Sequence, residues 1–162
     1  MIPRANWLAV VVAFATVAAD QLSKWAILSI VYKAYEPPIT ITSFFSLVMV
    51  WNHGMSFGML NRPEAPAVTS YAILFLTLLI IGALCRMAWR TTKRLERIGY
   101  ALTIGGALGN VIDRLHFGAV ADFLYFHIGT LGWPAFNVAD SAICIGVFIL
   151  LIAASRNSTV AS

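Results

Sequence analysis

Charge is the scarcest property of this sequence. Only 11% of its 162 residues are Asp, Glu, Lys or Arg, whereas about 25% is usual for a soluble domain. Hydrophobic residues make up 60% of the chain, and the mean hydropathy is +0.82. This composition excludes an ordinary soluble domain, and the net charge of +4 gives no indication of nucleic-acid binding. We therefore expect an integral membrane protein with one compact transmembrane domain covering residues 1–162.

Cysteine is also scarce. Cys85 and Cys144 are the two cysteines, and each lies inside an apolar run. A disulfide framework and a clustered-cysteine metal site are therefore not expected. We interpret both residues as lipid-facing or packing side chains.

Long apolar runs are abundant. Four stretches reach the roughly 20 helical residues needed to cross a bilayer: Trp7–Val31, Val68–Trp89, Ile98–His116 and Val138–Ala154. A cleaved signal peptide is the alternative interpretation of Met1–Ala19, because Arg4 precedes an apolar run that ends in small residues. Apolar residues resume at Trp25, however, and complete a full span.

The basic residues predict an orientation. Five of the 11 lie at or within the connection between the second and third spans, namely Arg86, Arg90, Lys93, Arg94 and Arg97. Arg4 and Arg156 flank the termini, whereas the two long connections hold only Lys33 and Arg62. By the positive-inside rule both termini are cytoplasmic and both long connections face outward. The outer stretch Ile39–Trp51 is rich in β-branched and aromatic residues, which predicts a small sheet lying on the membrane.

Four aspartates lie in or against apolar sequence: Asp20, Asp113, Asp122 and Asp140. An ionised carboxylate in such a setting is costly unless it is paired or hydrated. At a rise of about 1.5 Å per helical residue, Asp20 lies roughly 20 Å beyond Trp7. By the same rise Asp113 lies about 22 Å past Ile98. Asp140 begins a helix that enters from outside, and Asp122 precedes it in the outer connection, so all four aspartates are expected in the outer half of the membrane.

The four aspartates do not have equivalent sequence neighbours. Asp20 and Lys24 are four residues apart, a spacing that lets them pair on one helical face. Asp113 and Arg114 are adjacent and point in different directions, so we expect Asp113 to be structural as well. Asp122 and Asp140 have no basic partner nearby in sequence. Asp140 taken alone fits a helix-capping acid, but a second lone carboxylate at the same depth favours a catalytic pair.

The stretch Trp51–Gly58, WNHGMSFG, contains a G-x-S-x-G pattern centred on Ser56. A nucleophilic serine of this kind needs a strand-turn-helix setting and an oriented histidine. His53 is close in sequence, but nothing marks a third member of a triad. We therefore interpret Ser56 as part of a glycine-rich turn beside the site.

Five blocks of this sequence resemble the motifs of lipoprotein signal peptidase (signal peptidase II). In chain order they are DQLSK from Asp20, NHGMSFG from Asn52, GGALGNVIDR from Gly105, VADF from Val120 and FNVAD from Phe136. Their separations suit four spans, so the resemblance covers essentially the whole chain.

The resemblance implies an all-α bacterial inner-membrane protein with four transmembrane helices and a small extracytoplasmic β-rich region. It implies an aspartyl endopeptidase that removes the signal peptide from prolipoproteins, just before a diacylglyceryl-modified cysteine. No cofactor or metal is expected, and globomycin-type cyclic peptides are the expected inhibitors. The residues that match the catalytic aspartates are Asp122 and Asp140. Those that match the lining of the site are Asn52, Gly54, Asn110, Arg114 and Asn137, and Asp20 and Lys24 match the first motif.

Two other classes stay open at this point. A zinc hydrolase could use His53, His116 and His127, although their spacing matches no ligand motif. A small transporter or channel subunit is the non-enzyme alternative, because intramembrane Asp and Lys also mark ion paths. Such a protein is expected to show half-helices or repeats, and neither is evident.

Overall fold

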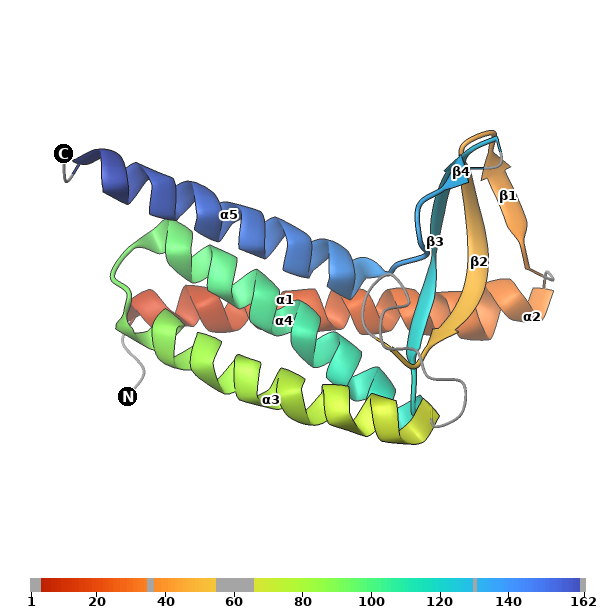
Figure 1. Ribbon diagram of the computed structural model, residues 1–162, viewed down its shortest axis with the longest axis horizontal. Helices are drawn as coiled ribbons and strands as arrows, with labels where there is room; N and C mark the ends of the chain where they lie inside the picture. The colour runs from red at the N-terminus through yellow and green to blue at the C-terminus, as the bar shows by residue number, and fades with distance from the viewer. Residues whose placement is uncertain (1–3, 35–36, 55–65, 130, 161–162) are drawn as a thin grey trace.

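The protein consists of four long helices with a small sheet across one end (Figure 1). The computed structural model describes residues 4–34, 37–54, 66–129 and 131–160. The helices are α1 (Arg4–Ala26), α3 (Pro66–Arg90), α4 (Arg94–Phe117) and α5 (Val138–Val160). A π-helical segment, η1 (Ile27–Val31), and the short α2 (Tyr32–Ala34) prolong α1.

Three helices of the described residues are long and apolar enough to cross a membrane, over Trp7–Ser29, Val68–Arg90 and Val138–Arg156. The predicted third span, Ile98–His116, lies within α4, which does not qualify. The reason is that α4 packs against α1, α3 and α5, and much of its surface is covered by protein. A helix enclosed in this way can carry small and polar residues that hydropathy counts against a span.

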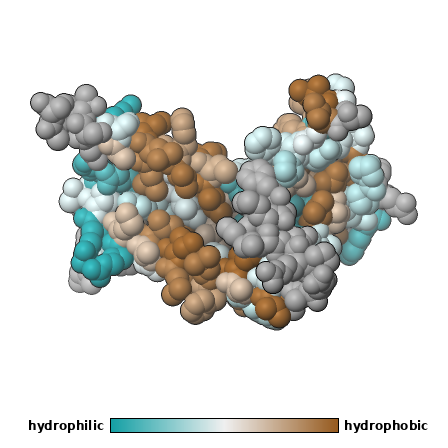
Figure 2. All heavy atoms as spheres, in the orientation of Figure 1, coloured by the Kyte–Doolittle hydropathy of each residue, from teal (hydrophilic) through white to brown (hydrophobic). Residues whose placement is uncertain are grey.

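The apolar core lies where α4 meets its neighbours. Its buried residues are Leu74, Ile81, Tyr100, Ile104, Ala107 and Val111. Outward-facing residues of the other helices, such as Phe14, Phe75 and Phe148, are large, apolar and exposed. Figure 2 shows apolar side chains over the middle of the helices and hydrophilic ones at the end opposite the sheet. This is the surface expected of a bundle surrounded by lipid.

Glycines on α4 allow close helix approach. A Cβ at Gly105 would lie 2.7 Å from the carbonyl oxygen of Ala13 in α1. A Cβ at Gly109 would meet the Asp20 carboxylate. The α1–α4 interface therefore depends on the absence of side chains at these positions.

Replacing Gly109 with alanine is expected to destabilise the protein by about 1–3 kcal/mol, because the added methyl displaces a buried carboxylate. Gly82 of α3 is the matched control, because nothing lies within 4 Å of a Cβ there. Thermal unfolding in detergent should show a lower Tm for Gly109→Ala and an unchanged or higher Tm for Gly82→Ala. Equal Tm values would contradict the close approach at Gly109.

The sheet is antiparallel and has the order β1-β2-β3-β4. Its strands are β1 (Ile39–Thr42), β2 (Phe45–Asn52), β3 (Val120–Ile128) and β4 (Leu131–Gly132). The predicted sheet over Ile39–Trp51 is present as β1 and β2, whereas β3 and β4 were not predicted. The first four residues of β3 are all buried, so the segment lacks the alternation of buried and exposed residues that marks a half-exposed strand.

The beginning of α5 is fastened to the sheet. Phe136 forms a bridge with Leu124 of β3, and backbone hydrogen bonds of 2.8 and 3.0 Å join the two residues. Asp122 lies two residues before Leu124 and faces Val50 of β2 in the register. The bridge therefore brings the first turn of α5 beside Asp122.

Candidate active site

The first turn of α5 is closed by a reciprocal cap. Asn137 Oδ1 accepts a hydrogen bond of 2.9 Å from the Asp140 backbone N–H. In return the Asn137 N–H donates to Asp140 Oδ2 at 3.3 Å. This is the capping-box arrangement, in which two otherwise unsatisfied donors are satisfied together. Asp140 is thus a helix-capping acid, but its second oxygen remains available for other contacts.

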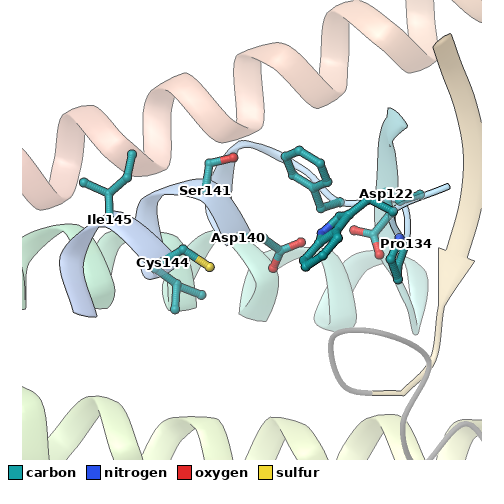
Figure 3. A pocket seen from close by; sticks show the side chains of 10 residues that line it. Asp122, Pro134, Asp140, Ser141, Cys144 and Ile145 are labelled. Atoms are coloured by element: carbon teal, nitrogen blue, oxygen red, sulfur yellow. The ribbon is translucent and has the colours of Figure 1, made fainter. Parts of the chain in front are cut away.

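The same asparagine connects the two predicted catalytic carboxylates. Asn137 Nδ2 donates to Asp122 Oδ1 at 2.8 Å, and its side chain is fully buried. Asn52 Nδ2 donates to the other oxygen of Asp122 at 3.0 Å. Asn110 Nδ2 donates to Asp140 Oδ1 at 2.9 Å. Figure 3 shows the side chains of Asp122 and Asp140 directed towards one another. The structure therefore brings Asn52, Asn110 and Asn137 together around both carboxylates.

The two carboxylates influence one another. The pKa of Asp122 is raised to about 7. Burial is the larger cause, and the negative charge of Asp140 is the second. The hydrogen bonds from Asn52 and Asn137 act in the opposite direction, because they stabilise the ionised form. Asp122 therefore keeps its proton at pH values below about 7.

A buried ion network lies behind the pair. Lys24 Nζ is 2.8 Å from Asp20 Oδ2 and 2.8 Å from Asp113 Oδ2. The predicted pairing of Asp20 with Lys24 is confirmed, and Asp113 joins it from α4. At most 3% of any of these three side chains is exposed. Two carboxylates therefore share one ammonium group inside the helix bundle.

Both carboxylates of this network accept hydrogen bonds from backbone N–H groups next to the acidic pair. Asp113 Oδ2 accepts the N–H of Ala121 at 3.1 Å. Asp20 Oδ1 accepts the N–H of Ala139 at 2.9 Å. Ala121 precedes Asp122, and Ala139 precedes Asp140. Lys24 therefore bridges the two groups that position the two carboxylates.

Gln21 belongs to the network and was not singled out from the sequence. Its Nε2 donates to Asp20 Oδ2 at 3.1 Å and to Asp113 Oδ1 at 3.0 Å. It also donates to the Gly109 carbonyl at 3.2 Å. A spacing of three from Lys24 places Gln21 on the same helical face, and this spacing is the signal that could have identified it.

Arg114 fixes the turn that carries Asn52. Its Nη2 donates to the Gly54 carbonyl at 2.8 Å. The Gly54 N–H in turn donates to Asn52 Oδ1 at 2.9 Å, which closes an Asx-type turn. Arg114 is 7% exposed, and its Nε has no hydrogen-bond partner among the described residues. The positive charge of Arg114 therefore lies buried beside the acidic pair.

A cavity of about 350 Å³ opens beside Asp122 and Asp140. Its other walls are largely apolar and include Trp133, Phe136 and Ile143. Ser141 and Cys144 of α5 also line it, and Figure 3 shows Asp140, Ser141, Cys144 and Ile145 following one another along the helix. Such a cavity can take an apolar chain while a polar bond lies at the carboxylates.

The three histidines do not form a common site. His53 Nδ1 lies 3.3 Å from the Gly118 carbonyl, and His127 Nε2 lies 3.0 Å from Ser46 Oγ. His116 packs edge-on against Phe117. Over residues 4–34, 37–54, 66–129 and 131–160, no group of three His, Cys, Asp or Glu side chains could hold a metal ion. Ser56 lies outside the described residues.

Comparison with known proteins assigns the chain to a family. The family profile described as "Signal peptidase (SPase) II" matches residues 12–156. The chain belongs to the signal peptidase II family. It is accordingly a membrane-embedded protease, and the matched range contains every residue of the acidic pair and of the buried network.

Individual relatives agree with the signal peptidase II assignment. The chain is 45% identical to the lipoprotein signal peptidase of Azoarcus sp. (strain BH72), over 93% of this chain and 82% of the relative. It is 42% identical to that of Syntrophotalea carbinolica, over 90% and 89%, respectively. A lipoprotein signal peptidase of Francisella tularensis subsp. novicida (strain U112) is 41% identical, over 88% of both chains.

Two solved structures, each described as a bacterial membrane enzyme, have a similar fold. One gives a TM-score of 0.76 at 26% identity and covers 93% of this chain and 89% of its own. The other gives a TM-score of 0.69 at 28% identity, with coverage of 90% and 91%. The helices and the sheet of this signal peptidase therefore follow an arrangement already seen in membrane enzymes.

Proposed function

We propose that this signal peptidase is an aspartyl endopeptidase of the bacterial inner membrane. It removes the signal peptide from diacylglyceryl-modified prolipoproteins by cleaving before the lipidated cysteine. The observation that carries this proposal is the placement of Asp122 and Asp140 around one buried amide, at the wall of an apolar cavity. Two close carboxylates that share a proton are the arrangement required for acid–base hydrolysis of a peptide bond.

The proposed chemistry assigns a different role to each carboxylate. Asp122 carries the shared proton, because burial and the neighbouring charge raise its pKa. Asp140 is the ionised partner, stabilised by N–H donors from Asn110 and Asn137. Asp140 draws a proton from a water molecule, and that water attacks the scissile carbonyl carbon while Asp122 donates its hydrogen bond to the carbonyl oxygen. A tetrahedral intermediate forms without a covalent bond to the enzyme.

In this proposal the remaining site residues position the two carboxylates. Asn52 orients Asp122, and Arg114 holds the Asn52–Gly54 turn in place through the Gly54 carbonyl. The buried Arg114 charge also offsets the negative charge that accumulates as the intermediate forms. Globomycin-type peptides are the proposed inhibitors, since they present a peptide and an apolar tail to the same cavity.

We further propose that α4 is the fourth transmembrane helix, enclosed by the other three. The beginning of α1, the end of α5 and the α3–α4 connection share the end opposite the sheet (Figure 1). The basic residues gathered there support a cytoplasmic location for that end. The sheet, and with it the acidic pair, then lies at the outer leaflet, where lipid-modified substrates are anchored.

Cysteine tagging tests this orientation. Ser43 in the β1–β2 turn and Thr92 in the α3–α4 connection are both exposed. In a background with Cys85 and Cys144 replaced by serine, a membrane-impermeant thiol reagent on intact inner-membrane spheroplasts should label Ser43→Cys and spare Thr92→Cys until the membrane is opened. Labelling of both positions from the outside would contradict the topology.

The reaction itself is tested with purified protein in detergent. A diacylglyceryl-modified prolipoprotein should yield a mature chain whose first residue is the lipidated cysteine, as read by mass spectrometry. The unmodified precursor is the matched control and should be cleaved far more slowly. A chelator should leave the rate unchanged. Cleavage at another bond, or abolition by the chelator, would overturn the proposal.

The rate should fall as pH rises through about 7, because Asp122 then loses the proton that it donates to the carbonyl. Asn52 stabilises the ionised form of Asp122, so Asn52→Ala should raise this pKa and move the alkaline limb to higher pH. The sign follows from the hydrogen bond, because its loss penalises only the charged form. Initial rates from pH 5 to 9 measure the limb, and a downward shift in Asn52→Ala would contradict the role of Asp122 as acid.

A further inference from the structure

A second cavity, of about 440 Å³, lies between α1 and the C-terminal half of α4. It shares no lining residue with the active-site cavity. Its walls are apolar and include Trp25, Leu28, Ile112 and Phe117, whereas Lys24 and Asp113 of the buried network lie among its polar lining. We call this cavity the α1–α4 groove.

One wall of the groove is formed where α1 departs from α-helical geometry. Leu28 and Ser29 line the groove, and both belong to the π-helical segment η1 (Ile27–Val31). The Ser29 hydroxyl donates to the backbone carbonyl of Trp25, one turn earlier. π-Helical turns are rare and are frequently found at functional sites.

Two basic side chains border the apolar walls. Lys33 and His116 both line the groove and are both exposed. No salt bridge joins either of them to another described residue, whereas Lys24 is engaged by Asp20 and Asp113. The groove therefore combines apolar walls with a lysine ammonium group and a histidine ring that can both donate to a ligand.

The depth of these groups matches the outer interface of a bilayer. At about 1.5 Å per residue, Trp25 lies roughly 27 Å along the helix from Trp7, and Lys33 lies beyond the ~30 Å hydrocarbon core. His116 is in the last turn of α4, at the sheet end of the bundle. Trp25 and Ile112 therefore lie at the depth of the acyl chains, and Lys33 lies at the depth of the phosphates. His116, about 27 Å along α4 from Ile98, lies near the boundary between the two.

We propose that the α1–α4 groove binds one anionic phospholipid of the outer leaflet. Its phosphate lies between Lys33 and His116, and an acyl chain lies along Trp25, Leu28 and Ile112. Charge-assisted hydrogen bonds from a lysine and a histidine suit a phosphodiester, and the apolar walls select a lipid over a soluble phosphate. The inference rests on the proposed membrane insertion and not on the proposed peptidase chemistry.

Native mass spectrometry of the protein in mild detergent tests the proposal. With phosphatidylglycerol added, the wild type should retain one lipid, and phosphatidylcholine with the same acyl chains should be retained less. Lys33→Gln and His116→Gln should together weaken retention by about tenfold. Arg156→Gln, which removes an exposed cation at the opposite end of the bundle, is the matched control and should retain lipid as the wild type does.

Each other outcome contradicts the proposal. Undiminished retention by the Lys33→Gln/His116→Gln variant would contradict the proposed phosphate contacts. Equal retention of phosphatidylcholine would contradict the proposed selectivity for an anionic lipid. Displacement of the lipid by glycerol 1-phosphate at millimolar concentration would indicate a soluble phosphate site instead. Because these variants lie outside the peptidase site, they should still cleave prolipoprotein. Failure of wild-type cleavage would count against the proposed function and leave the lipid result standing.

Discussion

Replacing either Asp122 or Asp140 with asparagine is expected to lower turnover of a diacylglyceryl-modified prolipoprotein by about 10³-fold or more, since general acid and general base contribute up to about 10⁴-fold. Asparagine keeps the shape of each carboxylate and removes its ability to exchange a proton. The double variant should be little worse than either single one, because residues that act as a unit are not additive. Single-turnover rates on purified variants measure the effect.

Ser141→Ala is the matched control for the pair. Ser141 follows Asp140 on α5 and lines the same cavity, but in this proposal it takes no part in proton transfer. It should retain most of the turnover. Asp113→Asn is unsuitable as a neutral control, because Asp113 pairs with Lys24 and accepts the Ala121 amide. Wild-type turnover in a folded Asp122→Asn or Asp140→Asn protein would contradict the proposed catalytic role of the acidic pair.

Lys24→Met is expected to destabilise the protein by about 3–5 kcal/mol, the usual cost of removing one partner from a buried ion pair. The substitution leaves Asp20 and Asp113 close together and buried without their shared cation. Both carboxylates accept backbone N–H groups beside the proposed catalytic pair, so activity should fall along with the Tm. Thermal unfolding in detergent and prolipoprotein cleavage measure the two effects.

Neutralising the stranded acids provides the internal check on this prediction. Asp20→Asn and Asp113→Asn added to Lys24→Met remove both unpaired charges and should restore part of the lost Tm. Arg156→Met removes an exposed charge and should change the stability by no more than about 0.5 kcal/mol. If Lys24→Met unfolds at the wild-type temperature, the network does not have the proposed supporting role.

The helices could be predicted from the sequence because each contains a long apolar run. The limit of that reasoning is α4, where Gly109, Asn110 and Asp113 face other helices and not lipid. Hydropathy measures affinity for lipid and does not register a helix that is enclosed by protein. The strand β3 was not predicted because its first residues are all buried. The segment therefore lacks the alternation of polar and apolar residues that marks a half-exposed strand.

In the candidate site, contacts within one helix could be predicted from the sequence, whereas contacts between distant segments could not. The pairing of Asp20 with Lys24 follows from a spacing of four, because a helix fixes the geometry over that distance. No spacing rule places Arg114 against Gly54, 60 residues away, or Asn137 between Asp122 and Asp140. These contacts depend on how the sheet meets the helix ends. The resemblance to a family indicated which residues to expect there, but not which atoms they contact.

The acidic pair is completed by α5, which follows the other described helices in the sequence. Asp140 and its cap Asn137 belong to α5, and they lie beside Asp122 in an arrangement where α5 packs against α4 and the Ala139 N–H donates to Asp20. The ribosome makes α5 after α1, α4 and β3. A nascent chain that extends only as far as β3 therefore lacks Asn137 and Asp140, and the proposed site does not yet exist in it. Assembly of α5 against the earlier elements is thus the step that completes the proposed site.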